Sequence, residues 1–129
     1  MLRFTIPFLS PSVNKLYRST LKKGKLIVYK TKEARDFVKQ VSYILPKKRL
    51  KGRVILYMRF FICKSNILKV DLDNFEKVLI DALKNKIIDD DRYIFEKHSY
   101  KYEVEKKDDE FIEIEVIPLD ASKSQNKGV

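Results

Sequence analysis

The chain contains one cysteine, one histidine, three glycines and no tryptophan among its 129 residues. A single thiol, Cys63, cannot form an internal disulfide and is too few for a cysteine-based zinc site, which agrees with a reducing compartment. No apolar run approaches the roughly 20 residues that a membrane-spanning helix needs. Residues 1–6 lack the charged start and cleavage site of a secretory signal. We therefore expect a cytoplasmic protein that makes no use of a membrane.

The length and the apolar content of the chain predict a single folded domain. Hydrophobic residues make up 44% of the sequence, and 12% of the residues are aromatic, so the chain can bury a core. The last ten residues are polar and contain no apolar pattern. We expect a domain over residues 1–119 and a flexible tail over residues 120–129.

Charge is divided unevenly along the chain. Residues 1–70 carry 18 Lys or Arg against two acidic residues, a net charge of +16, whereas residues 71–129 carry 10 basic and 16 acidic residues, a net charge of −6. A basic surface joined to an acidic centre is typical of proteins that hold nucleic acid through its phosphates. The alternative is a lysine-rich composition in which the ammonium groups are simply solvated.

The spacing of apolar residues predicts an α+β fold with a small mixed β-sheet packed against two helices. One helix begins at Thr31 as its N-cap and ends at Pro46, and the second begins at Asp73. Lysine-rich residues Thr20 to Thr31, with Gly24 at the turn, indicate an exposed hairpin or arm that follows a basic loop. The expected strands cover residues 4–8, 54–63, 93–102 and 111–118.

Two acidic segments carry the pattern that indicates chemistry. Asp71 and Asp73 lie at the start of the second predicted helix, and Asp89 to Asp91 form a later cluster. Carboxylates this dense repel one another unless a cation lies among them, and their hard oxygen atoms suit Mg²⁺ or Mn²⁺. Lys77 lies one helical turn beyond Asp73, where it could contact a phosphate. We interpret this pattern as a metal site that faces a phosphodiester.

Each of these residues also has an ordinary structural interpretation. Asp73 followed by Glu76 resembles a capping box at the start of a helix. The cluster 89–91 could be an acidic turn, and Lys77 could be an ion-pair partner of Asp73 or Asp81. The single His98 has no neighbours that would make it a general base.

Three blocks in order resemble the RusA family of Holliday junction resolvases, which are often associated with prophages. The blocks are Ile6-Pro-Phe-Leu-Ser-Pro-Ser-Val-Asn-Lys-Leu-Tyr-Arg18, Asp71-Leu-Asp-Asn-Phe-Glu-Lys-Val-Leu-Ile-Asp-Ala-Leu83 and Ile87-Ile-Asp-Asp-Asp-Arg-Tyr-Ile94. The resemblance implies a Mg²⁺-dependent homodimer that nicks four-way DNA junctions in pairs. The alternatives are a metal nuclease acting on RNA or on other branched DNA, and a non-catalytic DNA-binding protein.

The resemblance also implies roles for particular residues. Asp71, Asp73 and Asp91 correspond to the metal ligands and Lys77 to the catalytic lysine. The chain departs from the family pattern because it lacks a glycine before the acidic cluster and adds a third acid there, so Asp90 is an alternative to Asp91. The residues expected to contact DNA are Asn14, Lys15, Tyr17, Arg18 and Lys69.

Overall fold

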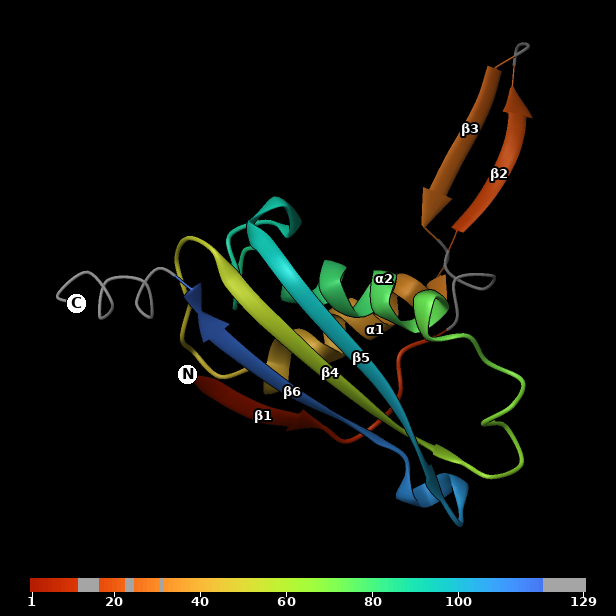
Figure 1. Cartoon of the computed structure of the whole chain (residues 1–129). Coiled ribbons are helices and arrows are strands. Elements are labelled where there is room, and N and C mark those ends of the chain that lie inside the picture. The colour runs from red at the N-terminus through yellow and green to blue at the C-terminus, as the bar shows by residue number, and fades with distance from the viewer. Residues whose placement is uncertain (12–16, 23–24, 31, 120–129) are drawn as a thin grey trace, which may run out of the picture.

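The computed structural model describes residues 1–11, 17–22, 25–30 and 32–119, with only the backbone described between residues 17 and 30. Its elements in chain order are β1 (Leu2–Ile6), β2 (Tyr17–Lys22), β3 (Lys25–Lys30), α1 (Lys32–Ile44), β4 (Val54–Cys63), α2 (Leu72–Leu83), the 3-10 turn η2 (Asp91–Tyr93), β5 (Ile94–Val104), the 3-10 turn η3 (Lys107–Asp109) and β6 (Phe111–Pro118). The predicted α+β class is confirmed, since two helices pack on one face of a mixed sheet (Figure 1).

The main sheet has the strand order β1-β6-β4-β5. β6 pairs antiparallel with both β1 and β4, whereas β4 and β5 run parallel. Parallel neighbours need a crossover connection, and α2 provides it between β4 and β5. β4 lies between two neighbours, whereas β5 lies at an edge of the sheet.

The core fills the space between the sheet and the helices. Along β4 the buried side chains alternate with half-buried ones, so one face of the strand points at the helices. The helices bury the apolar stripes that their spacing predicts. The buried helical residues with apolar side chains are Ala34, Phe37 and Val41 of α1, and Phe75, Val78, Leu79, Ala82 and Leu83 of α2.

Several boundaries differ from the prediction. β1 covers Leu2–Ile6 rather than residues 4–8, because Pro7 has no N–H to continue the ladder with β6. β5 extends to Val104, since its pairing with β4 continues beyond residue 102. Tyr17 and Arg18 lie in β2 rather than in a loop, and the predicted cap Thr31 lies outside the described residues.

The β2–β3 hairpin stands away from the body of the molecule (Figure 1). Its strands pair antiparallel from Tyr17↔Lys30 to Lys22↔Lys25, which confirms the predicted hairpin. Its predicted turn residue Gly24 and the predicted tail 120–129 lie outside the described residues.

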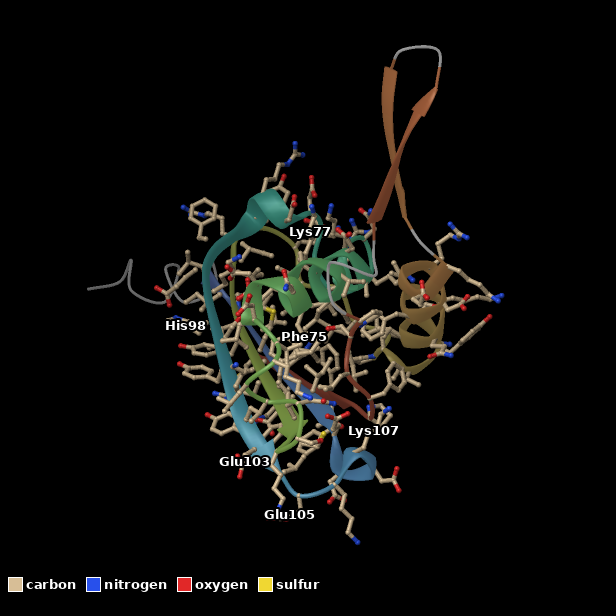
Figure 2. All side chains as sticks on the ribbon, turned by 90° about the vertical axis from the view of Figure 1, so that its right-hand side faces the viewer. Phe75, Lys77, His98, Glu103, Glu105 and Lys107 are labelled. Atoms are coloured by element: carbon tan, nitrogen blue, oxygen red, sulfur yellow. The ribbon has the colours of Figure 1, made fainter. Side chains whose placement is uncertain are left out.

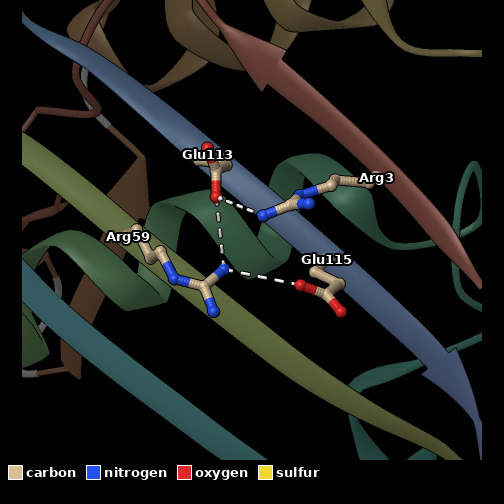
Figure 3. A network of polar contacts seen from close by, with 4 residues as sticks. All are labelled: Arg3, Arg59, Glu113 and Glu115. Carbon is tan, nitrogen blue, oxygen red and sulfur yellow. Dashed lines mark hydrogen bonds and ion pairs between the residues drawn. The ribbon is translucent and has the colours of Figure 1, made fainter.

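The sheet face opposite the helices carries stacked aromatic rings and an ion-pair network. Arg59 of β4 lies 3.4 Å from Glu113 and 3.6 Å from Glu115 of β6, and Arg3 of β1 also reaches Glu113 (Figure 3). On the same face, the His98 ring of β5 stacks on the Tyr57 ring of β4, with ring centroids 4.6 Å apart. These contacts tie all four strands together and leave the helix-covered side of the sheet for the candidate site.

Candidate active site

The inner face of β5 is polar where an edge strand would normally add apolar residues to the core. Strand alternation points Lys97, Ser99 and Lys101 toward the helix layer. Glu96 and His98 point to the opposite face of the sheet. Each of these three inner residues contacts either α2 or the loop that leads into it. β5 therefore forms a polar wall beside the start of α2.

The polar wall of β5 binds the carboxylate of Glu76 on α2. Glu76 is only 8% exposed, because it lies in the apolar stripe of α2 between Leu72 and Leu79. Lys97 donates a hydrogen bond to its carboxylate at 3.0 Å, and the Ser99 hydroxyl donates another. These two donors compensate the burial of the charge. The alternative of a capping box at Asp73 is wrong, since the N-cap is Asp71 and Glu76 bonds to β5.

An open hollow of about 1010 Å³ lies between α2 and the chain that runs from η2 into β5. Asp73 and Lys77 line it from α2, Asp91 lines it from η2, and Lys97 lines it from β5. Figure 2 shows Lys77 at the end of the molecule that carries η2. The structure therefore brings together three of the four residues predicted to form the catalytic site, with an extra ammonium group.

Lys84 connects the C-terminal end of α2 to the acidic cluster. Its ammonium nitrogen lies 3.5 Å from Asp81, 4.0 Å from Asp90 and 3.7 Å from Asp91. Interaction with the neighbouring Asp91 carboxyl group, followed by the hydrogen bond that the Asp91 backbone N–H donates at 2.8 Å, lowers the pKa of Asp90, and Lys84 and Arg92 add to this shift. The cation stabilises carboxylates that would otherwise repel one another.

Asp89 has a different environment from the other two acids of the cluster. It accepts hydrogen bonds from the Gly52 N–H at 3.2 Å and from Arg49 at 2.7 Å. The Gly52 hydrogen bond, followed by the Arg49 contacts, lowers the pKa of its carboxyl group. Asp89 therefore anchors the acidic turn to the segment before β4.

Asp71 faces a second, smaller hollow of about 380 Å³, which Asp73, Asn74 and Lys101 also line. Its side chain makes no capping hydrogen bond to α2. Because Asp71 and Asp73 both lie at the N-terminal end of α2, the helix dipole stabilises their negative charges. Asp73 lines both hollows, so it shares one with Asp71 and the other with Asp91.

The oxygen-only donor set of these aspartates fits Mg²⁺ or Mn²⁺ in its chemistry. Within the part of the chain that the structure describes, no three His, Cys, Asp or Glu side chains lie close enough to hold a metal ion. Asp71, Asp73 and Asp91 are thus neighbours across two adjoining hollows rather than one cluster, and the metal site stays a prediction.

Comparison with family models gives a match to the endodeoxyribonuclease RusA family over residues 9–117. The chain belongs to the RusA family. A comparison with curated proteins finds no match. The RusA match covers both hollows, the polar wall of β5 and the hairpin. Within the described ranges, no helix has the length and apolar character needed to cross a membrane.

The residues predicted to contact DNA in this RusA family member are only partly described. Asn14 and Lys15 lie outside the described residues. Tyr17 and Arg18 belong to β2, at the base of the projecting hairpin. Lys69 is exposed in the loop before α2 and lines a further hollow. Their DNA contacts stay predictions.

Sequence reasoning missed Glu76, Lys84, Lys97 and Lys101 as residues of the candidate site. For Glu76 a signal was present, because a charged residue three positions before Leu79 interrupts an apolar stripe and needs a partner. For Lys84 a signal was also present, because Asp81 lies three positions before it on the same helix. Lys97 and Lys101 left no local pattern, since their partners are distant in the sequence.

Proposed function

We propose that the protein is a structure-selective endodeoxyribonuclease that resolves four-way DNA junctions by paired, metal-dependent nicks. Membership of the RusA family supports nuclease activity on branched DNA. The observation that carries the proposal is the single hollow lined by Asp73, Lys77 and Asp91, which offers both carboxylates and an ammonium group to one phosphate.

The proposed reaction is hydrolysis of a phosphodiester bond. Water attacks phosphorus, one ester bond breaks, and the departing oxygen takes up a proton. Although their side chains do not form one cluster in this structure, Asp71, Asp73 and Asp91 are the oxygen donors that would hold Mg²⁺. The ion would supply a Lewis acid and lower the pKa of bound water. Lys77 and Lys97 bind the phosphate oxygens and stabilise the negative charge that grows on them.

The polar wall of β5 fixes the geometry of this site. Glu76 holds Lys97 by a 3.0 Å hydrogen bond, so the ammonium group keeps a defined place beside the hollow. Preorganised charge stabilises a transition state more effectively than charge that must first be reoriented. Near Asp71, the Lys101 ammonium group is also held in place, because it donates hydrogen bonds to the loop that precedes Asp71.

We propose that the active form is a homodimer, because two symmetric cuts across one junction require two sites related by a twofold axis. The net charge of +16 over residues 1–70 supports binding of the junction arms beside an acidic centre. Sedimentation of the protein alone and with junction DNA measures the stoichiometry, and one protomer per junction would contradict the dimer.

The decisive experiment compares a labelled four-way junction with a linear duplex of the same arms, with and without Mg²⁺. Symmetric nicks in the junction alone, dependent on metal, are the expected result. Cleavage of RNA or of other branched DNA in preference to the junction would identify a different nuclease. Tight junction binding without cleavage at any metal concentration would identify a non-catalytic DNA-binding protein.

A further inference from the structure

The loop between β4 and α2, residues 64–70, is held in one conformation by several hydrogen bonds. The N–H groups of Asn66 and Ile67 both donate to the Cys63 carbonyl, at 2.9 and 3.0 Å. Lys101 of β5 donates to the carbonyls of Ile67 and Val70, both at 2.8 Å. This lysine therefore clamps the loop at two points along its length.

The clamped loop turns one large apolar side chain outward. Ile67 and Val70 pack partly buried against the core, whereas Leu68 between them is 93% exposed. It is the most exposed of the large hydrophobic side chains in the described part of the molecule. The Lys101 hydrogen bonds to carbonyls on either side of Leu68 hold the backbone that presents this side chain to solvent.

Leu68 lies close to the proposed cleavage site. Asp71 lies three positions after it in the chain, so the two Cα atoms are at most about 11 Å apart. DNA rises about 3.4 Å for each base pair along a strand, and this distance corresponds to about three steps at most. A base step within that distance of the phosphate at the proposed cleavage site, beside Asp71 and Asp73, is therefore within reach of the leucine.

We propose that Leu68 is an apolar wedge that enters the opened base stack at the branch point of the DNA substrate. This inference rests on the proposed function and assigns a residue that selects branched over linear DNA. Apolar side chains that insert between base steps offset the cost of unstacking by burying their own surface, and a branch point is already partly unstacked. Linear duplex offers no such opening.

The surroundings of Leu68 favour DNA over a protein partner. Lys69 follows it directly and is exposed, whereas the exposed Lys64 at the start of the loop is paired with Glu105. The other strongly exposed large hydrophobic residues among the described ones belong to other segments, namely Met1, Tyr43, Ile44, Phe95, Tyr100 and Tyr102. A lone leucine followed directly by an exposed lysine suits a polyanion with apolar base faces better than an apolar protein surface.

The test uses the full chain and a four-way junction carrying 2-aminopurine beside the crossover, in Ca²⁺ so that cleavage does not interfere. Fluorescence should rise when the wild-type protein binds, as the base loses its stacking partner. Leu68→Ala and Leu68→Asn should lose most of this rise and weaken junction binding roughly tenfold, with duplex binding unchanged. Leu68→Phe should keep the rise.

Tyr43→Ala is the matched control, because Tyr43 is 76% exposed on α1 and its removal should change neither signal. A full fluorescence rise with Leu68→Ala, at wild-type junction affinity, would overturn the wedge while leaving the proposed function intact. A shift of Leu68→Ala from dimer to monomer in sedimentation, with the rise retained in the bound complex, would make this leucine a protein contact instead. Failure of the wild-type protein to bind or cut any junction would overturn the proposed function itself.

Discussion

Glu76 of α2 and Lys97 of β5 form an ion pair of 3.0 Å across the wall of the acidic hollow. The Glu76 carboxylate is buried, whereas the Lys97 ammonium group is half exposed. Loss of the ion pair therefore costs the two groups different amounts of free energy. The buried partner depends on the pair for its compensation, and the exposed one can turn to water. This asymmetry gives a prediction for the stability of the fold.

We predict that Lys97→Met destabilises the protein more than Glu76→Gln. Loss of the lysine leaves a buried carboxylate with a hydroxyl partner from Ser99, at a cost of about 1–3 kcal/mol in the free energy of unfolding. Urea denaturation measures this difference. The matched control is Lys64→Met, which removes an exposed ion pair with Glu105 and should cost less than about 1 kcal/mol. Equal losses for the two lysine variants would contradict the argument.

Substitution of the proposed metal ligands should separate binding from cleavage. Asp71→Asn, Asp73→Asn and Asp91→Asn should each abolish nicking while junction affinity stays the same or rises, because each removes a ligand and a charge that repels phosphate. Gel-shift and nicking assays on the same preparations measure both. If Asp90→Asn abolishes nicking and Asp91→Asn does not, the third ligand is Asp90.

Junction affinity should fall steeply with salt, and the logarithm of the association constant should fall linearly with the logarithm of the salt concentration. The reason is the release of counterions as the basic half of the chain, with its net charge of +16, neutralises phosphates. The double variant Lys15→Ala, Arg18→Ala should bind more weakly and flatten the slope by about two phosphate contacts. An unchanged slope would put the DNA surface elsewhere.

Lys77 should affect chemistry more than binding. We expect Lys77→Ala to slow single-turnover nicking by about a hundredfold or more, the scale of losing one charge contact in the transition state, with little change in junction affinity. Lys77→Arg should rescue poorly, since a planar guanidinium does not replace a point charge. A normal rate for Lys77→Ala would reduce the lysine to a structural contact on α2.

The lowered pKa of Asp89 predicts a specific pH dependence of stability. Its ordinary value is 3.8, and the Gly52 N–H and Arg49 hold the folded-state value lower. The ionised group therefore contributes its full stabilisation above about pH 3.8, and the contribution is lost as the pH falls through the folded-state pKa. Asp89→Asn should be less stable than wild type at pH 7, with the gap closing toward pH 3 in denaturant titrations. A constant gap would show that Asp89 does not act through its charge.

The sequence by itself determined the main elements and the local part of the site. The β-branched and aromatic content of residues 54–63 predicted one strand, and the alternation along residues 111–118 predicted another. The helical spacing from Phe75 to Leu83 reflects burial on one face of an element, which is a local property. Asp73 and Lys77 share a helix face for the same reason, since residues four apart are always neighbours there. Proline positions likewise predicted where α1 ends.

Only the tertiary structure decided which distant groups meet. The parallel pairing of β5 with β4 turns Lys97, Ser99 and Lys101 toward α2, and a register shifted by one residue would have presented Glu96 and His98 instead. The three acids of the cluster also differ in their contacts. Asp89 accepts a hydrogen bond from Gly52, which is 37 residues away in the chain, whereas Asp91 lies beside Lys84 at the C-terminal end of α2. Such contacts leave no local pattern, because they are set by how the layers pack rather than by spacing along the chain.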